Sequence, residues 1–244
     1  MLAAAQRDRI DVVLVSPRNP LNIGAVARAM ANFGFAHLAV VAAYELHWRE
    51  ARSAVGAPDL LASAREYLSV QESVAHCTLV LGTGTLTHRK PDQPVIPLPA
   101  LGPLIQRELA RDGRIGVLFG SEKHGLSRED LSLCHALVEI PTDSRQPSMN
   151  LGQAAAVCLY ELASGGARCN PESTRMRAAV DSADLERLGD LIQETMIAAR
   201  YSPESMHAAN RHDLRVLLRR LDLSPLDSRR IFGLFRRILH RLRP

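Results

Sequence analysis

Long apolar runs are missing from this sequence of 244 residues. A helix needs about 20 successive apolar residues to cross a bilayer, and no segment approaches that length. The amino terminus, MLAAAQRDRI, also lacks the apolar core of a signal peptide, because Arg7 and Asp8 interrupt it. We therefore expect a cytoplasmic protein with no membrane partner.

Cysteine is scarce, and its spacing carries no metal signature. The four cysteines form no C-x-x-C pair and have no histidine pair nearby, so a structural zinc site is not expected. Three of them stand in apolar segments, which favours buried small side chains over reactive thiols. The four are Cys77, Cys134, Cys158 and Cys169.

The common nucleotide and hydrolase signatures are absent as well. No G-x-G-x-x-G follows the first apolar segment, and neither G-x-x-x-x-G-K-[ST] nor H-E-x-x-H occurs. No G-x-S-x-G turn is present either. These absences disfavour a dehydrogenase, an NTPase and a serine hydrolase.

The composition is that of an ordinary globular protein with an unevenly placed charge. Hydrophobic residues make up 46% of the chain and charged residues 23%, which is enough for a packed core. The net charge is +4, but residues 201–244 hold ten arginines against four acidic residues, a local charge of +6. The rest of the chain therefore carries −2. This asymmetry indicates a basic tail that binds a polyanion.

Apolar segments rich in β-branched residues alternate with helical patterns through residues 10–162, which predicts an α/β fold with a mostly parallel sheet. The helix after the first strand is expected to start at Asn22 as N-cap and to stop at Gly34. A later helix is expected to take Ser148 as its N-cap. Residues 48–73 read as helical, with a break near 56–58. The expected strands are 10–16, 37–42, 77–82, 114–119 and 136–140.

The last third of the chain reads as a helical extension behind a linker. The polar, glycine-containing stretch 165–175 is the expected linker, with a first domain at 1–164 and a basic extension at 176–244. In the final helix an apolar stripe is expected to pack, and arginines occupy the opposite face. The stripe consists of Ile231, Leu234, Phe235, Ile238 and Leu242.

Three loops that follow predicted strands hold the residues best suited to bind a ligand. In open parallel sheets ligands bind outside the carboxyl ends of the strands, where backbone N–H groups are unpaired. The first loop and its helix hold Asn22 and Arg28, and the second is the glycine-rich segment 120–127. The third, 141–150, is bounded by prolines and is the first candidate for the site.

Together these loops resemble the TrmH (SpoU) branch of the SPOUT RNA 2′-O-methyltransferases. That branch is marked by N-x-x-x-x-x-R, present here from Asn22 to Arg28, and by F-G-x-E-x-x-G-L-S, present at 119–127. Its third mark, I-P followed by S-L-N-L and Y-E, is present at 140–161 with Met149 in place of leucine. The basic helical tail and the sequence NIGAVARAM at 22–30 are most similar to the TrmJ type.

The resemblance implies a deep trefoil knot in the carboxyl-terminal part of the sheet domain, a homodimer, tRNA as partner and S-adenosylmethionine as cofactor. No metal is implied, because the leaving group is already a cationic sulfur. The catalytic residues it implies are Arg28, Asn22, Ser148 and Asn150. The cofactor residues it implies are Thr83, Gly84, Phe119, Gly120, Glu122, Ile140, Ser148, Asn150 and Leu151.

The implied reaction is methylation of a ribose 2′-hydroxyl. We do not expect Arg28 to act as the general base, because a guanidinium stays protonated. We expect Arg28 to stabilise the developing alkoxide and to contact phosphate. The implied target is position 32 of the tRNA anticodon loop. Two alternatives stay open: the same chemistry on ribosomal RNA, and a non-catalytic RNA-binding protein on this fold.

Overall fold

The core of the molecule is one parallel sheet. The computed structural model describes residues 1–45, 47–50, 56–84, 91–165 and 178–243. Within these ranges seven strands pair in the order β3-β2-β1-β6-β4-β7-β5, and every neighbouring pair is parallel. The predicted α/β class with a parallel sheet is confirmed. The strands are β1 (Ile10–Val15), β2 (His37–Val41), β3 (Arg65–Tyr67), β4 (Leu79–Thr83), β5 (Val95–Pro97), β6 (Ile115–Phe119) and β7 (Ala136–Glu139).

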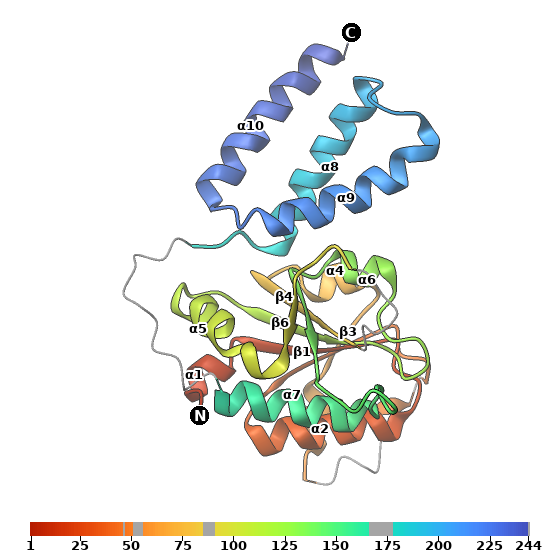
Figure 1. Cartoon of the computed structure of the whole chain (residues 1–244), viewed down its shortest axis with the longest axis vertical. Coiled ribbons are helices and arrows are strands. Elements are labelled where there is room, and N and C mark those ends of the chain that lie inside the picture. Colours follow the sequence, from red (N-terminus) through yellow and green to blue (C-terminus); the bar gives the residue numbers. More distant parts are fainter. Residues whose placement is uncertain (46, 51–55, 85–90, 166–177, 244) are drawn as a thin grey trace.

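Helices cover both faces of the sheet (Figure 1). The helices of the sheet domain are α1 (Ala4–Arg7), α2 (Pro20–Phe33), α3 (Pro58–Ser63), α4 (Val70–Ser73), α5 (Gly102–Ala110), α6 (Arg128–Ser132) and α7 (Leu151–Gly165). The short 3-10 turns are η1 (Trp48–Glu50), η2 (Leu98–Ala100) and η4 (Glu204–Met206). The remaining helices are α8 (Ser182–Ala198), α9 (His207–Arg220) and α10 (Pro225–Leu242).

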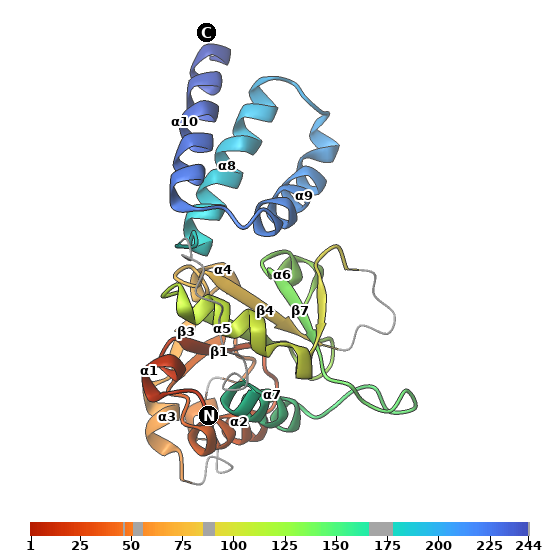
Figure 2. The same ribbon diagram turned by 60° about the vertical axis from the view of Figure 1, so that its left-hand side comes forward.

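Alternation along β1 divides the core into two layers. Val12 and Leu14 join the apolar cluster beneath α2 and α7, whereas Val13 and Val15 join the cluster beneath α4 and α6. All six residues of β1 are buried, as expected for a strand covered on both faces. Figures 1 and 2 show α2 and α7 side by side on one face of the sheet and α4 and α6 on the other.

Both helix starts next to the predicted ligand loops differ from the sequence prediction. Asn19, not Asn22, caps α2: its side chain accepts a hydrogen bond from the amide of Leu21, and Pro20 opens the helix. Asn150, not Ser148, caps α7, because its Oδ1 accepts from the amide of Gly152 at 2.9 Å. The prediction was wrong because several capping residue types stand close together at each start.

The segment predicted as helical at 48–73 is only partly so. It contains η1, α3 and α4 but also the edge strand β3, and β5 lies in a stretch where no strand was predicted. Each of these strands is three residues long, which is too short to show a period in the sequence. Trp48 is 1% exposed and packs in the core.

The helical extension, α8 to α10, sits beyond α4 and α6, on the side of the sheet away from α2 and α7 (Figures 1 and 2). The backbone N–H and the hydroxyl of Ser182 both donate to the carbonyl of Cys77 at 2.9 Å. Arg219, only 4% exposed, donates to the carbonyl of Leu133 at 2.9 Å and pairs with Glu186 at 3.0 Å. These buried contacts fix the extension to the sheet domain.

The apolar stripe of α10 packs only in part. Ile231 and Phe235 are partly buried against the small core of the extension, which confirms that part of the prediction. Leu234, Ile238 and Leu242 are 57%, 38% and 40% exposed, so the prediction that they pack was wrong within this chain.

The expected linker at 165–175 lies, after its first residue, outside the described residues, as does Cys169. The domain boundaries therefore stay a prediction. The other three cysteines are buried, as expected. Among the described helices none combines the length and the apolar character that a membrane crossing requires.

Candidate functional site

A cavity of about 280 Å³ lies at the carboxyl ends of β4, β6 and β7. The loop after each of these strands contributes to its wall, and α7 closes one side through Leu151 and Ala154. Such an edge is where parallel α/β proteins bind their ligands. Eight of the nine predicted cofactor residues line the cavity: Thr83, Gly84, Phe119, Gly120, Glu122, Ile140, Ser148 and Leu151.

Glycine is required at the first position of the loop after β6. A Cβ at Gly120 would lie 2.1 Å from the carbonyl carbon of Gly125 and 2.2 Å from the amide nitrogen of Leu126. The loop closes on itself there, because the amide of Gly125 donates to the carbonyl of Ser121 at 2.8 Å and Gly125 has a φ of +66°. A side chain at Gly120 would therefore force the backbone of the cavity wall apart.

Glu122 ties this loop to the start of α2. Its carboxylate accepts hydrogen bonds from the amides of Arg18 at 2.9 Å and Asn19 at 3.1 Å, and from the side chain of Asn22 at 2.9 Å. Burial would raise the pKa of Glu122, but these hydrogen bonds hold that pKa below its usual value. Glu122 therefore stays ionised at neutral pH and anchors two segments about 100 residues apart in the sequence.

Asn22 and Asn150 extend this connection to α7. The side-chain amide of Asn150 donates to Oδ1 of Asn22 at 3.0 Å, while Asn22 itself donates to Glu122. One chain of hydrogen bonds thus joins the starts of α2 and α7 to the loop after β6. Neither asparagine lines the cavity, so the structure places both as links that hold the cavity loops together.

Ser148 and Arg28 differ from the asparagines in having no described partner. Ser148 is exposed and lines the cavity, and its hydroxyl makes no hydrogen bond to any described residue. Arg28 is exposed on α2 and lies outside the cavity lining; within the described ranges it forms no hydrogen bond or ion pair. Among the described residues, nothing occupies the polar groups of these two side chains.

The sequence did not predict the backbone amides of Arg18 and Asn19 as holders of Glu122, nor Lys123 and His124 as lining residues. The glycine-rich loop was a signal for the lining residues, since it exposes consecutive positions to the cavity. No sequence signal pairs Arg18 with Glu122, because their contact is long-range.

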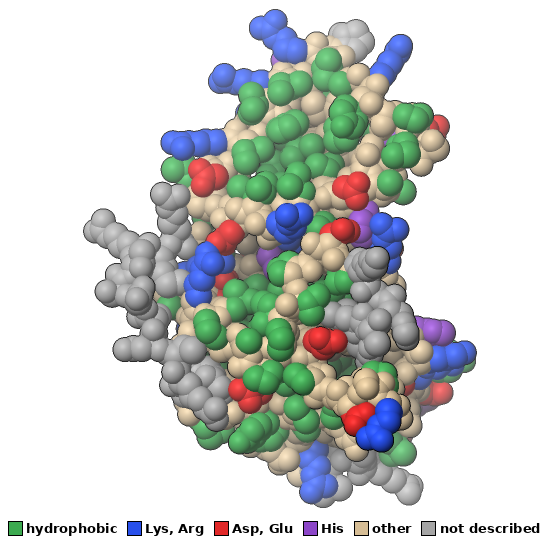
Figure 3. Space-filling view, viewed as in Figure 1, with side chains coloured by type: hydrophobic (Ala, Val, Ile, Leu, Met, Phe, Trp, Pro, Cys, Tyr) green, Lys and Arg blue, Asp and Glu red, His purple; other side chains and the backbone are tan. Residues whose placement is uncertain are grey.

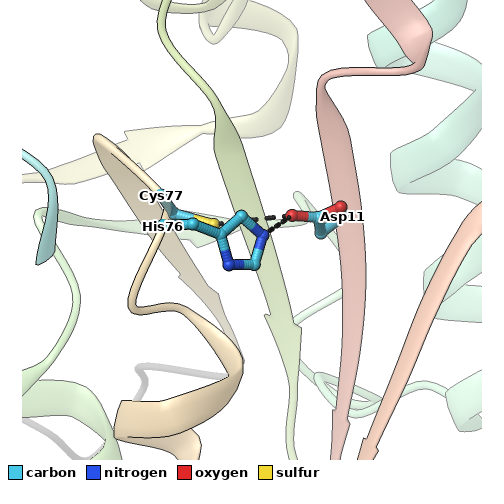
Figure 4. Close-up of side chains that lie close together, drawn as sticks. All are labelled: Asp11, His76 and Cys77. Atoms are coloured by element: carbon cyan, nitrogen blue, oxygen red, sulfur yellow. Dashed lines mark hydrogen bonds and ion pairs between the residues drawn. The ribbon is translucent and has the colours of Figure 1, made fainter. Parts of the chain in front are cut away.

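A second polar cluster surrounds Asp11 at the opposite, amino-terminal edge of the sheet (Figure 4). Nε2 of His76 lies 2.6 Å from Oδ2 of Asp11, and the thiol of Cys77 donates to the same oxygen at 3.6 Å. The ligand atoms of these three residues lie within 4.8 Å of one another. The residue types alone would suit zinc.

Arg114 gives the Asp11 cluster a structural role instead. It donates to both oxygens of the Asp11 carboxylate, at 3.0 and 3.1 Å, and its positive charge opposes a divalent cation there. Burial, and then the charge of Asp11, raise the pKa of the Cys77 thiol well above its usual value. The cluster therefore joins the starts of β1, β4 and β6 as an ion-pair network.

We expect Asp11 to contribute about 2 kcal/mol to stability at neutral pH. Burial alone would raise its pKa, but hydrogen bonds and positive charge from His76 and Arg114 lower it from 3.8 to about 2. Because the pKa is lower in the folded state, the contribution is complete above about pH 4 and is lost as the pH falls toward 2. Urea unfolding of Asp11→Asn and of the unmodified protein at pH 7 and pH 3 measures it.

The control for this experiment is Asp112→Asn, whose side chain is 96% exposed beside Arg9. An exposed ion pair contributes little, so its free energy of unfolding should change by less than about 0.5 kcal/mol at either pH. If Asp11→Asn destabilised the protein as much at pH 3 as at pH 7, the result would contradict the claim that the ionised carboxylate of Asp11 stabilises the fold.

The fold and the cavity together define an α/β protein that binds its ligand at the carboxyl edge of a parallel sheet. The profile of the SpoU rRNA Methylase family matches residues 9–160, which is more than half of the chain and includes all three cavity loops. The chain belongs to this family, and the family predicted from the sequence is confirmed.

TrmJ proteins are among its relatives. The "tRNA (cytidine/uridine/adenosine-2′-O-)-methyltransferase TrmJ" of Pseudomonas aeruginosa is 35% identical over 175 residues, 69% of this chain and 66% of that protein. The "tRNA (cytidine-2′-O-)-methyltransferase TrmJ" of Methanocaldococcus jannaschii is 36% identical over 154 residues, 63% of this chain and 66% of that protein. Both alignments span just under two thirds of the relative's length.

The architecture agrees with a solved TrmJ structure over nearly the whole chain. The crystal structure of TrmJ from Z. mobilis ZM4 matches with a TM-score of 0.82 and 27% identity. The match covers 93% of this chain and 98% of that one, so it includes helices of the extension as well as the sheet domain.

Proposed function

We propose that this protein is an S-adenosylmethionine-dependent tRNA ribose 2′-O-methyltransferase of the cytoplasm that acts on cytidine or uridine at position 32 of the anticodon loop. One observation carries the proposal: two of the segments that resemble the family, the loops after β6 and β7, line one cavity, and Glu122, Asn22 and Asn150 join them to the third, the start of α2. The names of the TrmJ relatives supply the chemistry and the class of RNA.

The cavity suits the proposed cofactor. Leu126, Ile140 and Leu151 provide apolar wall for an adenine ring, and the loop backbone provides polar groups. An added Cβ at Gly84 would meet nothing within 4 Å, so open space adjoins the chain there. The proposed cofactor-binding set is Thr83, Gly84, Phe119, Gly120, Glu122, Ile140, Ser148, Asn150 and Leu151. When bound, S-adenosylmethionine supplies an activated methyl group on a cationic sulfur.

Arg28 is the proposed stabiliser of the reacting oxygen. A ribose hydroxyl becomes negatively charged as its proton leaves, and a guanidinium, which stays protonated, can bind that charge and an adjacent phosphate. The proton passes to water or to the RNA phosphate. Ser148 orients the ribose through its hydroxyl, and Asn22 and Asn150 contribute by holding the loops in place.

We also propose a homodimer that forms through α2 and α7. Leu21, Val157 and Tyr160 on these helices are 55%, 39% and 55% exposed, and Arg28 belongs to the same layer. An interface there would bury these apolar side chains. It would also bring Arg28 toward the cavity of the second copy, which accounts for its place outside the lining of its own cavity.

The proposed division of the chain is a knotted methyltransferase domain at 1–164, a linker at 165–175 and a basic extension at 176–244. The trefoil knot is proposed from the family. The tRNA is the proposed partner of the extension.

The test is transfer of labelled methyl from S-adenosylmethionine to unmodified tRNA and, separately, to unmodified ribosomal RNA. We expect incorporation into tRNA alone. Incorporation into ribosomal RNA alone would support the methyltransferase activity but contradict tRNA as the substrate. The family's name, which refers to rRNA, is the reason to test this outcome. Cofactor binding without incorporation into either RNA would favour a non-catalytic RNA-binding protein.

A further inference from the structure

Three aromatic side chains in the described part of the chain are more than half exposed: Tyr44, Tyr160 and Tyr201. Tyr160 lies on α7 in an edge-to-face contact with Phe33, and Tyr201 follows α8 in the extension. Tyr44 follows β2, so of the three it alone lies at the carboxyl edge of the sheet, where the cavity is. An exposed aromatic ring at such an edge offers a surface on which a flat group can stack.

Two backbone hydrogen bonds connect Tyr44 to the wall of the cavity. The amide of Tyr44 donates to the carbonyl of Pro17 at 3.1 Å, and the amide of the next residue, Arg18, donates to Oε2 of Glu122 at 2.9 Å. Glu122 itself lines the cavity. Figure 1 shows the loops after β1 and β6 together at the right-hand edge of the sheet domain, and Figure 3 shows basic and histidine side chains at the same edge. The backbone of Tyr44 is therefore held close to the cavity.

The side chain of Arg18 holds the ring of Tyr44. Cζ of Arg18 lies 4.7 Å from the centroid of the ring, which is a cation–π contact. The guanidinium forms no hydrogen bond or ion pair with another residue in the ranges that the structure describes, and Tyr44 is 67% exposed. We call these two side chains the Arg18–Tyr44 pair. Their flat groups are fixed against each other and remain open to a third flat group.

Both loops that carry the pair begin with an unfavourable backbone conformation. Ser16, directly after β1, has a φ of +49°, and Ala42, directly after β2, has a φ of +47°. A side chain makes this left-handed conformation costly, and residues that adopt it are concentrated at functional sites. Arg18 and Tyr44 each follow two positions after one of these residues. The fold therefore maintains the pair at matched positions of two neighbouring loops against a local cost.

The chemistry of the pair fits a nucleobase. A base has a flat π face that stacks on tyrosine and on the plane of a guanidinium group. A free phosphate would need the arginine but not the ring. The pair does not line the cavity, so its ligand is separate from the adenine of the proposed cofactor. In a nucleotide the base is attached to the carbon next to the one that bears the 2′-hydroxyl, so the base of the reacting nucleotide must lie close to the cavity.

We propose that the base of the nucleotide that is methylated stacks on the Arg18–Tyr44 pair. This inference rests on the proposed function, because it takes RNA as the substrate and the ribose 2′-hydroxyl as the methyl acceptor. Stacking uses the flat face that all bases share, so the pair holds the reacting nucleotide in place without selecting the base.

The test removes the ring and the base separately and together. The unmodified protein and Tyr44→Leu are assayed on two stem-loop RNAs that differ at the methylated position, where one has the natural nucleotide and the other an abasic ribose. Loss of the ring or of the base alone should lower kcat/KM about 10-fold, as is typical when one base loses its aromatic stacking partner. Loss of the ring should have no further effect on the abasic RNA, because no base remains to stack.

Two control variants separate stacking from other effects. Tyr44→Phe keeps the ring and should behave like the unmodified protein on both RNAs. Tyr201→Leu removes a ring of similar exposure in the extension and should keep the full difference between the two RNAs. Tyr44→Leu should retain cofactor affinity and unfolding temperature, because the ring is exposed and the backbone hydrogen bonds of its loop remain.

The outcomes distinguish failure of this inference from failure of the proposed function. If the unmodified protein methylates no RNA, the proposed function fails and this inference fails with it. If it methylates the natural stem-loop and Tyr44→Leu does so equally well, or if the losses from ring and base multiply, only this inference is overturned. Coupling of the ring to an abasic site at a flanking position, in place of the methylated one, would also overturn it.

Discussion

Replacing Arg28 by alanine should lower the rate of methyl transfer by at least about 100-fold and leave cofactor affinity and thermal stability close to those of the unmodified protein. Loss of one group that stabilises a developing oxyanion typically has an effect of this size. Stability should not change, because Arg28 is exposed and makes no hydrogen bond or ion pair in the part of the chain that the structure describes. Single-turnover rates, calorimetric cofactor titration and thermal unfolding measure the three quantities.

Two further variants test the role of the guanidinium. Arg28→Lys keeps the positive charge but loses the planar fork, so its rate should fall between those of alanine and arginine. Unchanged turnover in Arg28→Lys would mean that charge alone suffices. Arg128→Ala removes another exposed arginine, at the start of α6, and should have no effect on the rate.

The second large effect is expected for Gly120→Ala. An added Cβ would lie 2.1 Å from backbone carbon of Gly125, so the cavity wall has to move. Overpacking of this kind costs about 1–3 kcal/mol, and the displaced loop should lose at least about 10-fold in affinity for S-adenosylmethionine. Thermal unfolding and cofactor titration give the two values.

Gly233→Ala is the matched control for Gly120→Ala. Gly233 lies within α10, and an added Cβ there would meet nothing within 4 Å. Alanine favours the helix, so this variant should be up to about 1 kcal/mol more stable and bind the cofactor normally. Wild-type cofactor affinity in Gly120→Ala would contradict the description of the cavity wall.

A mixture of Arg28→Ala and Gly120→Ala, assayed at a cofactor concentration where each alone is impaired, tests whether the site is shared between copies. If Arg28 of one copy serves the cavity of the other, a dimer with one Arg28→Ala and one Gly120→Ala subunit retains one complete site. Unfolded and refolded together, the two proteins should then recover part of the activity. If heterodimers form but activity is not recovered, Arg28 acts with the cavity of its own chain.

The sequence predicted the strands that carry the cavity because those strands are buried on both faces. β4 and β6 are almost entirely apolar, and β7 ends just before Pro141, which cannot continue the ladder. Their carboxyl ends share one edge in a parallel sheet, so the loops after them could be grouped before any geometry was known. The individual lining positions came from the resemblance to the TrmH family.

The hydrogen bonds that organise the loops could not be predicted in the same way. Asn22 and Asn150 are polar residues near helix starts, where a capping role is the usual expectation. Their contact with each other spans 128 positions, and that of Asn22 with Glu122 spans 100. Such pairings depend on how α2 and α7 pack together, which local sequence does not specify.

The extension shows a similar limit. The arginine count of the tail indicated a polyanion partner, but it could not separate Arg219, which is buried against Glu186, from Arg237, which is exposed on α10. Both occur in basic stretches of helical sequence. Only the packing of α9 against the sheet domain distinguishes an arginine that attaches the extension from one that stays exposed.

The most direct test of the central claim is to map the methyl group on tRNA after reaction with S-adenosylmethionine. Digestion to nucleotides and mass spectrometry identify the methylated atom and its position. We predict a ribose 2′-O-methyl group at position 32, present with the unmodified protein and missing with Arg28→Ala. Methylation of a base, or of ribose only at other positions, would contradict the account.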